Sequence, residues 1–356
     1  MRSRRQQTFG PHRICFFFIV SAFLFSCQPR NYRPQRQITP AFYYWKSVYA
    51  PGPYELSRIR ELQVGAQYIK FFDVAWNPVR KQAQPIAAIR FANGYQDALK
   101  NCQLVPVVFI TNECIRNLDT ISARLLASRI LQLVLDIRNG YDLKHVTELQ
   151  IDCDWTAGTR EPYFALLDEL KKLDTNLIIS ATIRLHQVKQ VQRAGIPPVH
   201  RGLLMCYNMG DMRDPSGRNS ILDPEELKKY LGKLHLYPLP LDIALPLFDW
   251  TVLFRNGKYA GLLKLNPGDL PVSALKKIST NRYLLLKDTA LSGFACRKND
   301  ELRYEASNLE DILLAGDYLS QTWKDTSARI SFFHMDSLIL QKYSNHDLKI
   351  VLDRFR

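Results

Sequence analysis

Short apolar runs recur along the chain, and each is followed by a segment whose apolar residues return at helical spacing. The runs are rich in β-branched and aromatic residues, as expected for parallel strands that are covered on both faces. They predict strands at 41–48, 67–76, 104–111, 146–155, 176–185, 201–209, 240–248 and 328–336. The segments between them predict helices at 54–63, 92–100, 121–138, 160–173, 186–194, 224–234, 308–322 and 345–354. This alternation predicts an α/β fold, a TIM (β/α)8 barrel.

Polar and aromatic residues gather where the predicted strands end, which favours the barrel over its competitor, a doubly wound sheet. No glycine-rich turn follows any strand, as a nucleotide-binding doubly wound sheet would require. Barrel enzymes keep their chemistry on the face formed by these strand ends. The residues concerned are Trp45, Lys46, Asp73, Trp76, Asn112, Glu113, Asp152, Asp154, Arg184, Tyr207, Asn208, Asp249, Trp250, His334 and Asp336.

The gap between the seventh and eighth predicted strands is far longer than an ordinary βα connection. We expect a small α+β insertion at 250–306, beside the active face of the barrel. Within it, residues 251–263 predict a hairpin that turns at Asn256 and Gly257. Residues 292–305 predict a second hairpin that turns at Asn299 and Asp300.

The N-terminus predicts export and lipidation. A basic segment with Arg2, Arg4 and Arg5 precedes the apolar run 14–25, which is short for a transmembrane helix. The sequence "LFSC" then resembles a bacterial lipoprotein signal, with cleavage before Cys27 and lipid attached to that residue. An ordinary secretory signal or a short anchor helix is the alternative. We expect a signal peptide at 1–26, a flexible tether at 27–38 and the barrel domain at 39–356.

This organisation places the protein in the cell envelope, anchored to a membrane and facing the periplasm or the cell exterior. Removing residues 1–26 deletes four arginines and no acidic residue, so the net charge falls from +14 to +10. The basic residues are scattered, and we expect no nucleic-acid partner. Five cysteines follow Cys27, without CxxC or Cys/His zinc spacing, so we expect no structural metal and no cofactor.

Two stretches, "IDCDWT" at 151–156 and "LMCYNM" at 204–209, resemble motifs of the chitinase-like family 18 glycoside hydrolases. That family ends its fourth barrel strand in D-x-x-D-x-D-x-E and carries M-x-Y-D on its sixth. Asp152 and Asp154 match the second and third aspartates of the first motif, and Met205 and Tyr207 match the M and Y of the second. The predicted insertion also stands where that family often has one. The stretches "YYWKSVY", "LQIDCDW" and "LPLDIALPLFDW" further resemble a bacterial family of TIM-barrel lipoproteins with no assigned activity.

The departures from the family 18 pattern concern the chemistry itself. The first aspartate is replaced by Leu149 and the M-x-Y-D aspartate by Asn208, and the eighth strand lacks tryptophan. The position of the catalytic glutamate is Thr156, whose hydroxyl is too weak an acid to protonate a leaving group. Asp154 retains the position that orients the substrate's acetamide in the family, but the family mechanism does not carry over intact.

Other carboxylates provide an alternative route to glycoside hydrolysis. Glu113 and Asp249 follow the third and seventh strands, and Asp154 with Asp249 would reproduce the two-carboxylate arrangement of many glycosidases. Asp152 would keep a neighbouring carboxyl protonated by like-charge repulsion. A structural alternative remains for Asp152, a buried ion pair with Lys70 or Arg184. His334 and Asp336 are more simply explained by packing than by metal binding.

A saccharide ligand is favoured because flat aromatic side chains surround these carboxylates. The candidate ligand-contacting residues are Trp45, Asp73, Trp76, Arg184, Tyr207, Asn208 and Trp250, with Tyr44 as a further aromatic. Two hypotheses follow. One is a membrane-tethered glycoside hydrolase whose acid/base residues are Asp152, Asp154, Glu113 and Asp249, and the other is a catalytically inactive barrel lipoprotein that binds glycan.

Overall fold

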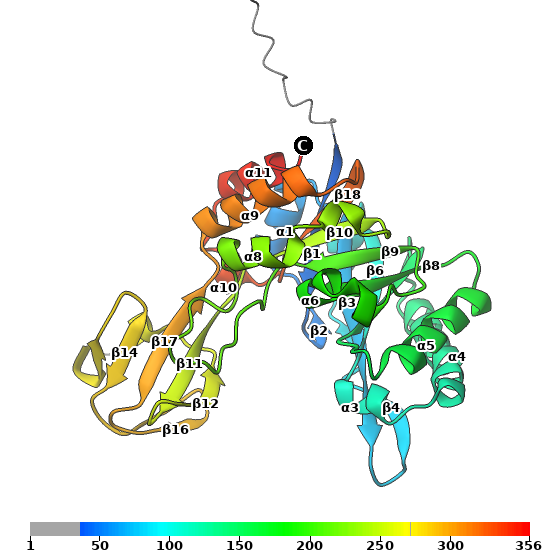
Figure 1. Cartoon of the computed structure of the whole chain (residues 1–356). Coiled ribbons are helices and arrows are strands. Elements are labelled where there is room, and N and C mark those ends of the chain that lie inside the picture. The colour runs from blue at the N-terminus through cyan, green and yellow to red at the C-terminus, as the bar shows by residue number, and fades with distance from the viewer. Residues whose placement is uncertain (1–35, 271) are drawn as a thin grey trace, which may run out of the picture. The chain divides into compact units, whose positions relative to one another are not determined.

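The computed structural model describes residues 36–270 and 272–356, and it confirms the predicted barrel. Eight parallel strands are hydrogen-bonded in the order β1-β18-β10-β9-β8-β7-β6-β3, and pairing of β1 with β3 closes the ring (Figure 1). The strands are β1 (Gln37–Tyr44), β3 (Ala66–Asn77), β6 (Gln103–Ile110), β7 (Glu148–Cys153), β8 (Ile178–Arg184), β9 (Arg201–Met205), β10 (Leu241–Pro246) and β18 (Ser327–Phe333). Each overlaps a predicted strand, because continuous apolar runs mark strands that are buried on both faces.

Helices connect the strands as predicted, and several begin at a side chain that caps their first turn. Asp119 accepts from the backbone N–H of Ser122 at the start of α4, and Asp223 accepts from those of Glu225 and Glu226 at the start of α8. The helices are α1 (Pro53–Glu61), α2 (Gln96–Leu99), α3 (Asn112–Arg116), α4 (Thr120–Gly140), α5 (Arg160–Leu173), α6 (Leu185–Lys189), α7 (Val191–Ala194), α8 (Pro224–Leu231), α9 (Leu309–Thr322), α10 (Ser337–Leu340) and α11 (Asn345–Asp353). The helix predicted at 92–100 is reduced to α2, because Gly94 has a φ of +81° and forms a turn before it.

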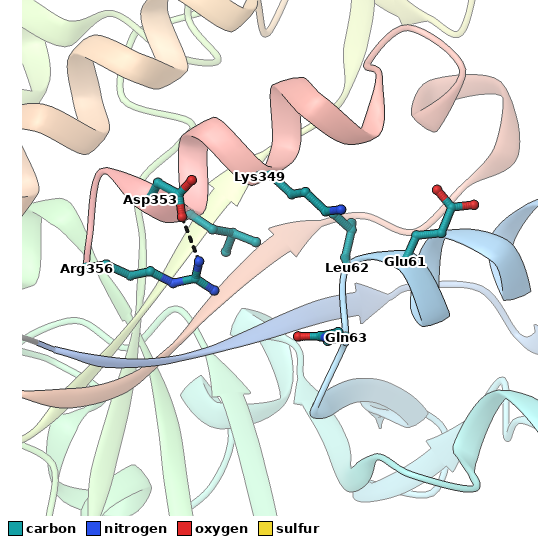
Figure 2. A pocket seen from close by; sticks show the side chains of 7 residues that line it. Glu61, Leu62, Gln63, Lys349, Asp353 and Arg356 are labelled. Carbon is teal, nitrogen blue, oxygen red and sulfur yellow. Dashed lines mark hydrogen bonds and ion pairs between the residues drawn. The ribbon is translucent and has the colours of Figure 1, made fainter.

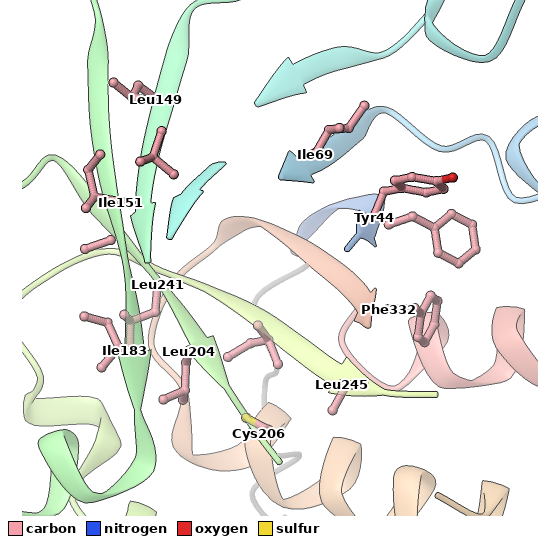
Figure 3. Packing of buried hydrophobic residues seen from close by; sticks show 14 of the residues in the cluster. Tyr44, Ile69, Leu149, Ile151, Ile183, Leu204, Cys206, Leu241, Leu245 and Phe332 are labelled. Atoms are coloured by element: carbon pink, nitrogen blue, oxygen red, sulfur yellow. The ribbon is translucent and has the colours of Figure 1, made fainter. Parts of the chain in front are cut away.

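The core between strands and helices is built from alternate strand residues. On β7, Leu149, Ile151 and Cys153 are fully buried among the aliphatic and aromatic side chains shown in Figure 3. Trp155 continues this outer face, and its indole N–H donates to the carbonyl oxygen of Ala194 at 2.9 Å. The residues between them, such as Asp152, therefore point into the barrel.

The predicted insertion between the seventh and eighth strands is present and is mainly antiparallel sheet. Its strands are β11 (Asp249–Arg255), β12 (Lys258–Leu263), β13 (Leu275–Lys277), β14 (Arg282–Leu285), β15 (Thr289–Leu291), β16 (Phe294–Cys296) and β17 (Glu301–Ala306), and its 3-10 turns are Pro267–Asp269 and Val272–Ala274. The hairpin at Asn256 and Gly257 is confirmed. The hairpin predicted at Asn299 and Asp300 is wrong, because β16 pairs with β15 while β17 pairs with β11 and β14.

Smaller elements complete the described chain. They are the strands β2 (Val48–Tyr49), β4 (Gln82–Ile86) and β5 (Arg90–Phe91) and the 3-10 turn Leu234–Leu236. β4 forms a hairpin with the C-terminal half of β3. Across residues 36–270 and 272–356, none of the helices combines the length and apolarity needed to cross a bilayer.

The boundary at the N-terminus differs slightly from the prediction. β1 begins at Gln37, so the last two residues of the predicted tether belong to the barrel, where Gln37 pairs with Ser327 and Ile38 with Ala328. The predicted signal peptide and the predicted lipidation site, Cys27, lie outside the described residues.

A polar hollow lies at the opposite end of the barrel from the strand ends that carry the candidate site. It has a volume of about 190 Å³ and is bounded by the C-terminal ends of α1 and α11 (Figure 2). Its lining includes Glu61, Lys349, Asp353 and Arg356, and Asp353 is paired with Arg356. None of the candidate site residues lines this hollow.

Candidate functional site

Asp152 lies inside the barrel, near the C-terminal end of β7, and its side chain is almost completely buried. The hydroxyl of Thr182 on the neighbouring strand β8 donates to Asp152 Oδ1 at 2.6 Å. Burial raises the pKa of Asp152; the positive charge of Arg184 opposes this rise, and the negative charges of Asp154 and Asp73 add to it. The structural alternative for Asp152, an ion pair with Lys70 or Arg184, does not form, because Lys70 pairs with Asp73 and Arg184 with Asp154; the charge of Arg184 nevertheless acts on Asp152.

Asp154 is instead the carboxylate that pairs with Arg184. The register of β7 and β8 aligns Ile151 with Ala181, so the residues three positions further on lie side by side at the barrel mouth. Burial alone would lower the pKa of Arg184, but the charges of Asp152 and Asp154 more than offset it, and the pKa is raised. The guanidinium therefore stays charged and neutralises Asp154.

Other carboxylates at the mouth are also neutralised by a basic side chain. Lys70 contacts Asp73 at 3.0 Å, and Lys46 contacts Asp336 at 2.5 Å. Asp249 pairs with Lys342, which lies after α10. The sequence suggested that Asp249 works together with Asp154. In the structure each of the two carboxylates is paired with its own basic side chain instead.

The remaining predicted acids do not replace the missing glutamate. Glu113 lies in the first turn of α3, is exposed, and within the described residues its carboxylate contacts no basic side chain. Thr156 is exposed just beyond β7, and its hydroxyl lies 3.4 Å from that of Thr159. No acidic group therefore occupies the position of the family 18 proton donor.

Aromatic rings form a continuous arc around the mouth. Ring centroids of neighbours lie 5.8 Å apart for Trp45 and Phe109, 6.3 Å for Trp45 and Phe333, 5.6 Å for Phe333 and Phe248, and 5.2 Å for Phe248 and Trp250. All five are only partly buried, so each keeps some exposed surface. We call these five residues the aromatic arc.

The sequence predicted two members of the aromatic arc, Trp45 and Trp250, and missed the three phenylalanines. Phe333 was detectable, because it follows Arg329 and Ser331 at the two-residue spacing of the inward face of β18. Trp76 lies on the hairpin of β3 and β4 and packs against the outer core, and it takes no part in the arc. Tyr44 is likewise buried in the outer core, where its hydroxyl donates to the carbonyl oxygen of Val48.

Tyr207 lies below the arc and stacks on Phe333 with ring centroids 5.2 Å apart. Its hydroxyl is buried and has no hydrogen-bond partner in the part of the chain that the structure describes. A buried hydroxyl without a partner loses the hydration it had in the unfolded chain, so it favours a ligand or water that can bind it. The next residue, Asn208, has a φ of +56° and donates its backbone N–H to the carbonyl oxygen of Ile221.

The described residues around the mouth form no cluster of metal ligands. His334 and Asp336 are the pair considered from the sequence, but Asp336 binds Lys46 and caps α10. Over residues 36–270 and 272–356, no group of three or more histidine, cysteine or acidic side chains is placed to hold a metal ion.

Solved structures with a similar fold include several chitinases and a spore cortex-lytic enzyme. The spore cortex-lytic enzyme SleL of Bacillus cereus is 12% identical with a TM-score of 0.52, and the match covers 90% of this chain and 75% of that one. A chitinase from Chromobacterium violaceum is 12% identical with a TM-score of 0.52, covering 88% of this chain and 99% of that one. The C-terminal domain of a putative chitinase from Desulfitobacterium hafniense is 10% identical with a TM-score of 0.55, covering 90% of this chain and 100% of that one. No family model and no curated protein sequence matches the chain. At such low identity the likeness concerns the fold, and the chain has the barrel fold of the chitinase-like glycoside hydrolases.

Proposed function

We propose that the C-terminal face of the barrel binds a saccharide, and that binding rather than hydrolysis is its main activity. The observation that carries this proposal is the aromatic arc, which presents partly exposed rings directly above buried polar groups. Flat rings pack against the apolar faces of sugars, while hydroxyl and carboxyl groups below them bind sugar hydroxyls or an acetamide. The buried hydroxyl of Tyr207 is one such group that is free to bind.

The structural neighbours support a saccharide as the ligand class. Those with the same fold include chitinases, and one of them, the class V chitinase of Nicotiana tobaccum, is described in complex with NAG4 at 11% identity and a TM-score of 0.51. Their ligand contacts are not transferred residue by residue, because the sequences have diverged so far. The N-acetylglucosamine tetramer is nevertheless the natural first probe.

Binding is favoured over hydrolysis by the state of the carboxylates. Hydrolysis needs one acid to protonate the leaving oxygen and a second group to assist attack. Asp154 and Asp249 are both engaged by basic side chains, and position 156 carries a threonine. Carboxylates that form ion pairs with basic side chains can orient a ligand, but they carry no proton to donate to a leaving group.

Glycoside hydrolysis remains the second candidate, and the environment of Asp152 favours it. A carboxyl whose pKa is raised by burial is the kind of group that enzymes use as a general acid. Asp152 has this property, and Asp154 lies beside it. If the protein is a hydrolase, Asp152 protonates the leaving oxygen, while Asp154 with Arg184 orients the sugar. Glu113 and Asp249 are then the further candidates for the acid/base role.

A binding experiment with matched tryptophan variants tests the proposal. The protein carrying Cys27→Ser is titrated with the N-acetylglucosamine tetramer and a panel of envelope glycans, using calorimetry. Trp45→Ala is expected to weaken binding by about tenfold, or roughly 1.4 kcal/mol, because a stacking surface is lost. Trp76→Ala, on the hairpin outside the arc, serves as the control and is expected to leave affinity unchanged. Equal effects of both variants, or no binding to any glycan, would sink the proposal.

An activity assay on the same samples separates the two candidates. Incubation with the bound glycan, followed by mass spectrometry of the products, is expected to show no cleavage. Cleavage that disappears in Asp152→Asn but persists in Glu113→Gln would favour the hydrolase instead.

We further propose that lipid on Cys27 tethers the barrel to a membrane of the cell envelope. The support is the "LFSC" sequence after a basic and apolar N-terminus, with a polar segment leading into β1. Cys27→Ser is expected to move the protein from the membrane fraction to the soluble fraction and to abolish labelling by an alkyne fatty acid. Unchanged membrane retention would point to a short anchor helix.

A further inference from the structure

A buried ion pair lies on β17 of the insertion. Arg303 Nε lies 2.7 Å from Glu305 Oε1, and neither side chain has any exposed surface. Taking two charges out of water is costly, and a buried pair is tolerated when its remaining donors and acceptors are also satisfied. What those remaining groups bind therefore shows what the pair does.

Arg303 binds the connection that leads from β9 to α8. Its Nη1 donates to the carbonyl oxygens of Asp214 at 2.6 Å and Gly217 at 3.2 Å, and its Nη2 donates to that of Met212 at 3.1 Å. Glycine at 217 suits the turn of this loop, because a Cβ there would lie 3.1 Å from the Asp214 carbonyl oxygen. The planar guanidinium thus holds three backbone carbonyls of one loop.

Glu305 binds the two segments that flank the site. Its Oε2 accepts from the hydroxyl of Ser220 at 2.5 Å, from the backbone N–H of Ser220 at 3.2 Å, and from the indole N–H of Trp250 at 2.8 Å. One carboxylate oxygen therefore fixes both the end of the 208–221 loop and the orientation of a tryptophan in the aromatic arc.

Both segments lead directly to the proposed sugar-binding residues. Trp250 contacts Phe248, whose ring lies 5.8 Å from that of Tyr207. At the other end, the backbone N–H groups of Asn208 and Met209 donate to the carbonyl oxygens of Ile221 and Ser220. The 208–221 loop thus returns to the residue that follows Tyr207.

We propose that the Arg303–Glu305 pair is a positioning device that sets the orientation of Trp250 and the path of the 208–221 loop, and thereby the affinity of the mouth for its saccharide. This inference rests on the proposed function for its ligand, but not for its structural part. Neither residue touches the ligand; each acts through groups that do.

Limited trypsin digestion tests the loop directly, because Arg213 and Arg218 lie within it. Arg303→Lys keeps a positive charge beside Glu305, but its three ammonium donors cannot serve Glu305 and the three carbonyls together, and they lack the planar fork of arginine. Cleavage after Arg213 and Arg218, followed by mass spectrometry, is expected to become at least about tenfold faster (~1.4 kcal/mol of lost protection). Arg255→Lys is the matched control, since Arg255 pairs with Asp300 in the same sheet and bonds no residue of the loop. Equal cleavage rates in the two variants would overturn the proposal.

The second readout is the indole environment. Glu305→Gln retains an amide oxygen for Trp250 and Ser220, whereas Glu305→Leu removes every acceptor. The fluorescence of Trp250, taken as the difference from Trp250→Phe in each background, is expected to shift in Glu305→Leu and to be largely restored in Glu305→Gln. A Trp250 spectrum that is the same in all three backgrounds would contradict the assigned role.

Affinity for the N-acetylglucosamine tetramer completes the test. Arg303→Lys is expected to weaken binding about tenfold (~1.4 kcal/mol), while Arg255→Lys leaves it unchanged. If the unaltered protein does not bind the tetramer, the ligand assignment fails, and digestion and fluorescence alone decide the positioning role. If it binds and Arg303→Lys binds equally well, the link between the pair and the site is refuted.

Discussion

Asp152 and Asp336 lie on the same face of the barrel but in opposite electrostatic environments. Burial raises the pKa of Asp152, and the nearby Arg184 only partly opposes it. Burial would also raise the pKa of Asp336, but the hydrogen bond and charge of Lys46 reverse the effect, and its pKa is lowered. The two residues therefore couple folding to pH with opposite signs.

The expected pH dependence of stability follows from these directions. Between the ordinary carboxyl pKa, about 4, and the raised value of Asp152, the native state binds more protons, so this residue destabilises the fold as pH rises. Asp152→Asn removes that loss and is expected to flatten the decline in the free energy of unfolding above about pH 4. Urea titrations across the pH range measure the free energy of unfolding. If its change with pH is the same in both proteins, ionisation of Asp152 does not destabilise the fold.

Asp336→Asn provides the opposite control. Because the pKa of Asp336 is lowered, its stabilising contribution is present above the ordinary carboxyl pKa and is lost as pH falls through the native value. The substitution is therefore expected to lower stability near neutral pH and to reduce the loss of stability in acid.

The identity of individual partners was the part of the site that sequence reasoning could not reach. Asp154 and Arg184 lie near the ends of neighbouring predicted strands, but the sequence offered Arg184 to Asp152, and the structure gives it to Asp154. The pairing of Asp249 with Lys342 did not follow, because it joins the insertion to a segment after the eighth strand, and no periodicity encodes that distance. The same holds for Lys70, which the sequence offered to Asp152 and the structure gives to Asp73.

At the scale of elements, apolar periodicity was sufficient for the barrel and insufficient for the insertion. A strand buried on both faces carries a long apolar signal, whereas β15 and β16 have three residues each and little alternation. The turn residues at 299–300 were read as a hairpin, but Asp300 binds Arg255 instead and ends a longer connection. Pairing among short strands depends on such side-chain contacts rather than on pattern.

Close packing between barrel strands gives a prediction at this scale. A Cβ added to Gly202 on β9 would lie 2.7 Å from Ile183 Cγ1 and 2.8 Å from Leu241 Cδ2, side chains of the two neighbouring strands. Gly202→Ala is therefore expected to lower the free energy of unfolding by about 1–3 kcal/mol through overpacking. Urea denaturation measures the change.

Gly232, which follows α8, supplies the control for Gly202. A Cβ there meets nothing closer than 3.9 Å, and its backbone is helical, so Gly232→Ala is expected to be neutral or stabilising by up to about 1 kcal/mol. Similar losses in the two variants would mean that the Gly202 contacts do not control strand packing.

At the scale of the whole molecule, a buried polar network joins strands from distant parts of the chain at the end of the barrel opposite the mouth. Arg329 on β18 lies 2.7 Å from Glu148 on β7 and 3.5 Å from Asp242 on β10. Asp242 also accepts from the hydroxyl of Tyr68 at 2.8 Å and from Arg201 at 2.5 Å. One arginine from the last strand thus ties together strands that only a closed barrel brings close, so the network is complete only when the ring is closed.

Removing Arg329 should therefore destabilise the barrel as a unit. Arg329→Met leaves Glu148 fully buried without its cation, and loss of one partner from a buried pair costs about 3–5 kcal/mol. The surface pair of exposed Lys172 and half-buried Glu169, 3.7 Å apart on α5, is the control, and Lys172→Met is expected to cost less than about 1 kcal/mol. We expect fluorescence and circular dichroism to report one shared shift of the unfolding transition for Arg329→Met. A shared shift is expected because a network that spans the closed ring couples its loss to every strand at once. A separate early transition would instead mean that the strands around Arg329 open locally while the other strands stay folded.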